Sequence, residues 1–256
     1  MSNIYGIALN TYRESLREKL LYLVIVYAGV LLVSTYILSP FSVGAGRGKI
    51  VTDIGLATIS IFGVITAIMV GSRLVHKEID KKAVFMVITR PVSRVEYIAG
   101  KFAGIMMALG ALTGLMTAVM LAVMLVSGVG VSGAVVLAVL LTIIEIALIA
   151  SIVIFFSTFT TPILTSFFSI CIFAAGSLSN DLRAFAEKFG GETMKTVIGA
   201  VYFLLPNMAT FNLRHEAVHG LRYSHGEVLL PVLYGLAYIA AMLYFAYLVF
   251  RRREFS

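Results

Sequence analysis

The chain has 256 residues, of which 60% are hydrophobic and only 13% are charged, and its mean hydropathy is +0.99. Soluble domains are roughly 45–50% apolar and about 25% charged, so the composition excludes an ordinary soluble domain and indicates an integral membrane protein. The net charge of +7 does not indicate nucleic-acid binding, because the basic residues stand at the ends of apolar segments. The single cysteine, Cys171, excludes an internal disulfide and a C-x-x-C site.

Residues 1–19 predict an amphipathic helix that lies in the membrane interface. Ile4, Ala8, Tyr12 and Leu16 repeat every four residues and would share one face of a helix. The alternative is a solvated N-terminus without fixed structure. No short apolar core with a small-residue cleavage site precedes the first long apolar run, so no cleaved signal peptide is expected.

Six apolar runs are long enough, or nearly long enough, to cross a bilayer. An α-helix needs about 20 residues to span the hydrocarbon core of ~30 Å. Turn formers such as Ser39-Pro40 and the glycine-rich 127–133 separate the runs. We therefore expect an all-α, polytopic membrane protein that forms one transmembrane domain over residues 1–256, with spans at 20–38, 54–72, 102–126, 134–156, 163–178 and 228–250.

A basic segment, residues 73–101, stands between the second and third runs. It contains seven of the twenty Lys and Arg residues, which is typical of a cytoplasmic loop. Its short apolar stretch 84–88 cannot cross a bilayer, so we expect a helix lying against a surface, interrupted at Pro91. Ser93 and Glu96 then have the S-x-x-E spacing of a capping box, which starts the helix of the third span.

Residues 179–227 form the longest polar segment and include a charge-free stretch, 196–213. A seventh span here would place the basic C-terminus, 251–253, opposite the basic segment, so we expect a buried or re-entrant segment broken at Pro206. With six spans, thirteen Lys and Arg residues lie on the cytoplasmic side and seven outside. The expected location is the cytoplasmic (inner) membrane, with both termini cytoplasmic.

Three short motifs suggest chemistry. His215, Glu216 and His219 match the zinc-binding H-E-x-x-H, and His225 adds a third histidine, but Arg222 replaces the glycine of the extended motif. A metal site at His215, His219 and His225 therefore remains an alternative to a chance pattern in a polar loop. Glycine-rich segments at 44–49 and 128–133 lack the spacing or the strand that a phosphate loop requires. Any ATP hydrolysis must then belong to another subunit.

Glu145 is the ionisable residue inside a predicted span. A charge there costs roughly 2.5–3.5 kcal/mol on insertion scales, so the side chain should face protein or water. Two interpretations stay open: Glu145 lines a translocation path, or it packs in a hydrogen-bonded interface between helices.

The sequence HKEIDKKAVFMVITRPVSRVEYIAGKFAG resembles the first cytoplasmic loop of export-type ABC-transporter permeases, in particular the group assigned to multi-copper enzyme maturation. Residues 204–220 and the tail 250–255 are similar to that group's last external loop and C-terminus. Related permeases serve copper-enzyme maturation, motility, and lipid or drug export, so the resemblance does not name a substrate.

The resemblance implies a transport subunit without catalytic residues, which forms a homodimer in membrane lipid and uses ATP and Mg bound by a separate ABC ATP-binding subunit. The loop's short helix would be a coupling helix in a groove of that subunit. The contact residues would be Glu78, Asp80, Val84, Phe85, Met86, Arg90, Pro91 and Arg94. A membrane-embedded zinc metalloprotease using His215, Glu216 and His219, and a non-transporting membrane scaffold, remain the alternatives.

Overall fold

The computed structural model describes residues 3–17, 20–38, 46–80, 93–189, 191, 198–199, 205–219 and 225–252 of the chain. Every regular element in this part is a helix. In chain order the helices are α1 (Asn3–Arg17), α2 (Leu20–Leu38), α3 (Gly46–Asp80), α5 (Arg94–Val126), α6 (Gly133–Ser157), α7 (Pro162–Ser177), α8 (Ser179–Phe189), the 3-10 helix η2 (Met208–Phe211), α10 (Arg214–His219) and α11 (His225–Arg252).

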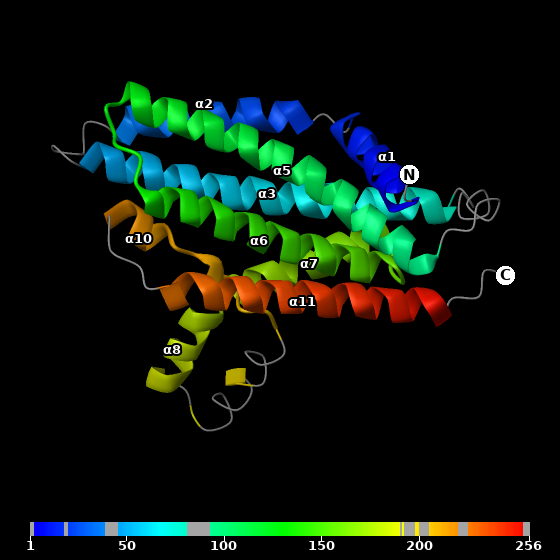
Figure 1. The fold of residues 1–256 in the computed structure, drawn as a ribbon. Helices are drawn as coiled ribbons and strands as arrows, with labels where there is room; N and C mark the ends of the chain where they lie inside the picture. The colour runs from blue at the N-terminus through cyan, green and yellow to red at the C-terminus, as the bar shows by residue number, and fades with distance from the viewer. Residues whose placement is uncertain are drawn as a thin grey trace.

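The long apolar helices run alongside one another as a bundle (Figure 1). Helices α3, α5, α6 and α11 are each long and apolar enough to cross a membrane. A fifth crossing results when α7 and α8, which are bent by 54° relative to each other, are counted as one broken span. The first predicted span corresponds to α2, whose described apolar part, Tyr22–Ile37, is shorter. The protein is thus a polytopic α-helical membrane protein, as the sequence predicts.

The predicted spans agree with the helices most closely where a turn former ends the apolar run. Helix α6 begins one residue before the predicted 134–156 and ends one residue after it, and Pro162 stands in the first turn of α7 as expected. Helices α3 and α5, with 35 and 33 residues, extend well beyond the predicted 54–72 and 102–126. Charged residues mark the limit of the hydrocarbon core, but they do not end a helix, so both helices continue past the membrane-spanning part.

The capping box at the start of α5 is confirmed. The Oγ of Ser93 accepts a hydrogen bond from the main-chain N–H of Glu96 at 3.2 Å, and the main-chain N–H of Ser93 donates to Oε2 of Glu96 at 2.8 Å. These two bonds satisfy amide groups that a helix leaves unpaired in its first turn. The sequence therefore located the start of α5 to within one residue.

Helix α6 lies at the centre of the bundle. In its most apolar 18-residue stretch 72% of the residues are buried, against 17% in α11. Helix α3 approaches α6 closely through glycines: a Cβ on Gly71 would lie 2.7 Å from Cγ1 of Val153, and one on Gly63 would overlap Ile146. Small residues are common where membrane helices pack, because they bring the two main chains together.

Helix α1 packs against α5 through a face that shares Ala8 with the predicted apolar stripe and otherwise carries small polar side chains. The buried residues are Ala8, Thr11 and Ser15, and a Cβ on Gly104 of α5 would lie 2.6 Å from Cβ of Thr11. The predicted stripe is only partly covered, since Leu16 is 41% exposed. Small side chains allow the close helix contact, which leaves the larger apolar side chains at its edge, where they can meet lipid.

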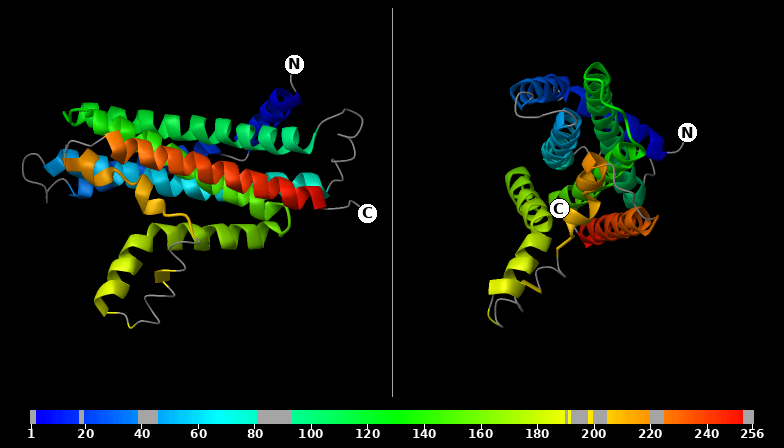
Figure 2. Two further views of the ribbon diagram at one scale, coloured as in Figure 1. Left: turned by 60° about the horizontal axis from the view of Figure 1, so that its bottom comes forward. Right: turned by 90° about the vertical axis from the view of Figure 1, so that its left-hand side faces the viewer.

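Both described ends of the chain lie at the same end of the bundle, together with the end of α3 and the start of α5 (Figure 1). The end of α2, the start of α3 and the connection from α5 to α6 lie at the opposite end. We call the first end the loop end, after residues 73–101. Helix α8 points away from the bundle in both views of Figure 2.

Candidate functional site

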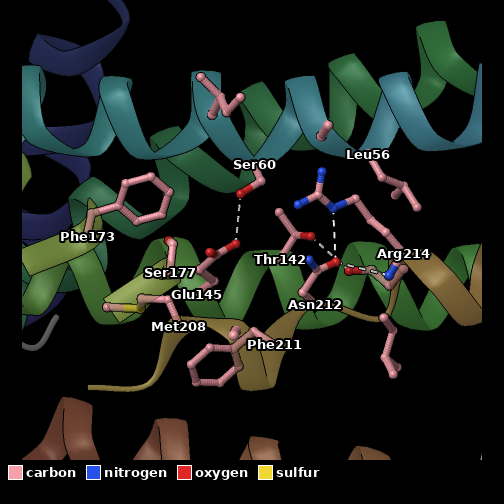
Figure 3. A pocket seen from close by; sticks show the side chains of 15 residues that line it. Leu56, Ser60, Thr142, Glu145, Phe173, Ser177, Met208, Phe211, Asn212 and Arg214 are labelled. Carbon is pink, nitrogen blue, oxygen red and sulfur yellow. Dashed lines mark hydrogen bonds between the residues drawn. The ribbon is translucent and has the colours of Figure 1, made fainter. Parts of the chain in front are cut away.

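Glu145 lies near the middle of α6, a helix of 25 residues whose other side chains are uncharged. Its side chain is 9% exposed and accepts a hydrogen bond from Oγ of Ser60 on α3 at 2.9 Å (Figure 3). A carboxyl group at this depth needs a polar partner or water, and the hydroxyl of Ser60 supplies one. The structure therefore places Glu145 at the contact between α3 and α6.

Glu145 also lines a pocket of about 210 Å³ between α3, α6, α7 and residues 208–214. The wall contains six polar side chains among apolar ones: Ser60, Thr142, Glu145, Ser177, Asn212 and Arg214. Thr142 bonds within its own helix, to the carbonyl oxygen of Ala138 at 2.9 Å. The two interpretations of Glu145 are thus compatible, because one side chain is hydrogen-bonded between helices and also faces a pocket.

Arg214, the first residue of α10, brings a positive charge to the same pocket (Figure 3). Its Nε donates to Oδ1 of Asn212 at 2.9 Å, and its main-chain N–H donates to the same oxygen at 3.1 Å. Asn212 therefore fixes both the start of α10 and the direction of the guanidinium. Helix α10 packs on α3 and α6, so the residues that follow η2 lie against the same two helices as the pocket.

The chain is held beside the pocket at Pro206 and Asn207. Oδ1 of Asn207 accepts from Oγ of Ser179 at 3.0 Å, its Nδ2 donates to Oδ1 of Asn180 at 3.0 Å, and its main-chain N–H donates to the hydroxyl of Tyr234 at 3.1 Å. A Cβ on Gly176 would overlap the carbonyl oxygen of Pro206, so only glycine allows this approach. Residues 206–213 include the buried Met208, Phe211 and Leu213. Most of the predicted buried or re-entrant stretch before Pro206 lies outside the described residues, so the break there stays a prediction.

Comparison with known families decides the class of protein. The model of a family described as "ABC-2 family transporter protein" matches residues 5–255. The chain belongs to the ABC-2 transporter family. It is therefore a membrane permease of an ABC transporter, and such a permease works in general with an ABC ATP-binding subunit. No curated protein matches the chain. The match supports neither the metalloprotease nor the scaffold, and the copper-maturation group stays a prediction.

The residues predicted to contact the ATP-binding subunit lie at or beyond the loop end of the permease. Glu78 and Asp80 belong to the last turn of α3, and Arg94 is the first residue of α5. The side chains of these three residues are outside the described part. Val84, Phe85, Met86, Arg90 and Pro91 lie outside the described residues altogether. Their role as a coupling helix therefore stays a prediction.

The three histidines stand on two helices of the permease. His215 and His219 are one turn apart in α10, and His225 begins α11. Among the side chains that the structure describes there is no group of three His, Cys, Asp or Glu residues able to hold a metal, but these histidine side chains are not among them. A metal contact at His215, His219 and His225 stays a prediction.

Sequence reasoning missed Arg214, Ser60 and Asn212 as parts of the permease's site. Ser60 is one of several hydroxyl residues in its span, and nothing in the local pattern connects it with Glu145, 85 residues away. Arg214 stands directly before the histidine motif, and the motif made the following residues, not Arg214, the candidates for a site. One signal could have identified Ser60. A charged residue inside a span requires a polar partner, and Ser60 lies near the middle of another span, so it was a candidate partner for Glu145.

Proposed function

We propose that this permease exports its substrate across the cytoplasmic membrane, using ATP hydrolysed by a separate subunit that docks on the loop 73–101. The observation that carries the proposal is the pair of long helices on either side of that loop. At 1.5 Å per residue, α3 with 35 residues and α5 with 33 residues are about 50 Å long, whereas the hydrocarbon core is ~30 Å thick. Both helices are therefore longer than a membrane crossing requires, and we assign part of this excess to the loop end, where the partner would dock.

The same helices connect the loop end with the pocket. Helix α3 carries Ser60, which bonds Glu145, and it packs against α6 on the loop side of this bond through Gly63 and Gly71. A closely packed helix pair transmits a displacement because it has little free volume. Closure of the ATP-binding subunits would then alter the wall of the pocket, provided that ATP binding favours one permease conformation over another.

Charge distribution supports the orientation in which the loop end is cytoplasmic. The loop, the N-terminal segment and the C-terminus hold thirteen of the twenty Lys and Arg residues, and all three belong to the loop end. We further propose a homodimer surrounded by lipid. Large apolar side chains on α2 and α7 support it, since Tyr36 is 83% and Ile163 is 82% exposed and both would meet lipid or a second protomer.

Charge reversal at the loop end tests the docking assignment. Glu78→Lys and Arg94→Glu, each in a permease reconstituted with its ATP-binding subunit, should abolish most of the ATPase stimulation by the permease. Asp53→Lys and Lys49→Glu are matched controls, because these exposed residues lie near the opposite end of α3. Both controls should retain stimulation.

The outcome separates docking from folding. The loop variants should show the thermal unfolding of the unmodified permease while failing to co-purify with the ATP-binding subunit. Unchanged stimulation and co-purification in both loop variants would refute the proposed docking surface. Equal losses in the controls would show that charge reversal acts on the permease as a whole, which would also refute it.

A further inference from the structure

Two opposite charges line the pocket, and Arg214 acts electrostatically on Glu145 although the two side chains make no direct ion pair. The carboxylate of Glu145 accepts from Ser60, and the guanidinium of Arg214 donates to Asn212. Both side chains are among the described residues, and within the described part no ion pair joins them. Their partners are neutral groups in both cases, so each charge faces the pocket with hydrogen-bonding capacity left over.

A carboxyl group as deeply buried as that of Glu145, which is 9% exposed, requires polar or charged partners. Charged groups inside proteins are usually paired or bound to a ligand, because removing them from water is costly. A carboxylate has about four acceptor sites and a guanidinium has five donors. The bond from Ser60 and the bond to Asn212 use one of each, which leaves most of them for water or for a ligand. A ligand that carried the complementary charges would satisfy both groups together.

We propose that this pocket binds a small zwitterion, with its cationic group at Glu145 and its anionic group at Arg214. The inference rests on the proposed function and deepens it by naming a class of ligand for the permease. The anionic group can be a phosphate or a carboxylate, since a guanidinium binds both through paired N–H donors. The cationic group is an amine with one or more N–H donors for the carboxylate, or a quaternary ammonium.

The size and lining of the pocket agree with such a ligand. Its volume of about 210 Å³ is below the ~300–1,000 Å³ of pockets that hold drug-sized molecules, so it suits a headgroup or an amino acid. Phe173 and Phe211 line it together with Met208. Aromatic rings attract a cation near their faces, which adds to the preference for an ammonium group beside Glu145.

The same chemistry has two sources, a free zwitterion in solution and the headgroup of a zwitterionic lipid. The experiment distinguishes them with two probes, O-phosphoethanolamine and a short-chain phosphatidylethanolamine with six-carbon acyl chains. Both are titrated by calorimetry into the permease purified with its ATP-binding subunit in an uncharged detergent. Equal affinities indicate a free zwitterion, and tighter binding of the lipid indicates a headgroup whose acyl chains also make contact. Either result supports the proposal.

The variants test the assignment of each end of the ligand. Glu145→Gln and Arg214→Gln should each weaken binding of O-phosphoethanolamine about 10- to 100-fold, the effect of one hydrogen bond to a charged group. Glu145→Gln should lose binding of ethanolamine while keeping that of inorganic phosphate, and Arg214→Gln should do the reverse. A variant that is merely misfolded would lose both fragments. Asp53→Asn and Lys49→Gln are the matched controls and should keep all binding.

Three outcomes would overturn the inference: no binding of either zwitterion to the unmodified complex, equal loss of both fragments in both variants, or full binding in Glu145→Gln and Arg214→Gln. These outcomes are separate from the test of the proposed function. If no zwitterion binds while Glu78→Lys still abolishes ATPase stimulation, the proposed function remains supported and only the proposed class of ligand is refuted. If stimulation persists in the loop variants, the proposed docking falls whatever the pocket binds.

Discussion

The contact between α3 and α6 has two unlike halves, and both helices run in the same direction through them (Figure 1). On the loop side of the Ser60–Glu145 bond, Gly63 and Gly71 bring α3 against Ile146 and Val153. On the other side the two helices line a polar pocket that residues 208–214 complete. In the closed half the two glycines meet apolar side chains at short distances, whereas the open half has charge and space. We infer that the closed half transmits movement and the open half receives a ligand.

The largest expected effect comes from widening the closed half. Gly63→Val places new atoms where Ile146 now lies, and overpacking a core costs about 1–3 kcal/mol. For a chain of this size each kcal/mol lowers Tm by roughly 2–4 °C, so thermal unfolding of the purified permease should detect the change. Gly114→Val is the matched control, since a Cβ there has no neighbour within 4 Å. An unchanged Tm in Gly63→Val would show that the closed half is not tightly packed.

The bond at the boundary between the halves should give the next largest effect. Ser60→Ala leaves the carboxyl group of Glu145 without its donor, which costs about 1–3 kcal/mol for a buried group. Glu145→Gln should assemble normally yet alter transport, because the amide keeps the shape and loses the charge. The double variant should be less destabilised than the sum of the single variants, since the two residues interact directly. Strict additivity of the free energies of unfolding would show that the bond contributes nothing.

Some of the features that separate the closed half from the open half could be predicted from the sequence, and others could not. The limits of α6 and α7 followed from charge-free runs ended by turn formers, and the start of α5 followed from Ser93 and Glu96. Glu145 attracted attention because a charge in a span is expensive. These features depend on local sequence and on the membrane, both of which a single chain reveals.

The remaining parts depend on contacts between distant segments. Arg214 looks like an ordinary polar-loop residue until residues 206–213 are packed on the bundle, which requires Asn207 to meet Ser179 and Tyr234. The contact between α1 and α5 was not predicted, because hydrophobic periodicity ignores small residues such as Thr11, which lies against Gly104. The length of α3 was underestimated because the apolar run measures the membrane and not the helix.

Asn207 tests how firmly the outer wall of the open half is held. Asn207→Ala removes the side-chain bonds to Ser179 and Asn180. It should cost about 1–2 kcal/mol, since each net hydrogen bond contributes about 0.5–1.5 kcal/mol and the exposed bond to Asn180 lies at the low end of that range. Arg214 follows on the same segment, so binding of O-phosphoethanolamine should weaken as well. Asn180→Ala, which loses one exposed bond, is the milder control. Equal Tm and equal affinity in the two variants would mean that Asn207 does not hold the wall.

The smallest effect should come from Thr142, a polar group that lines the open half without a partner across it. Its Oγ1 donates to the carbonyl oxygen of Ala138 in the same helix, at 2.9 Å. That carbonyl also accepts a main-chain bond, so Thr142→Val should cost less than about 1 kcal/mol while preserving volume. Ser151→Ala in the closed half, where Oγ donates to Leu148 of its own helix at 2.7 Å, is the matched change. Both variants should keep Tm within a few degrees, and Thr142→Val should bind the zwitterion as before. A fall in affinity as large as that of Arg214→Gln would show that the hydroxyl of Thr142 contacts the ligand. Glu145 and Arg214 would then not account for ligand binding by themselves.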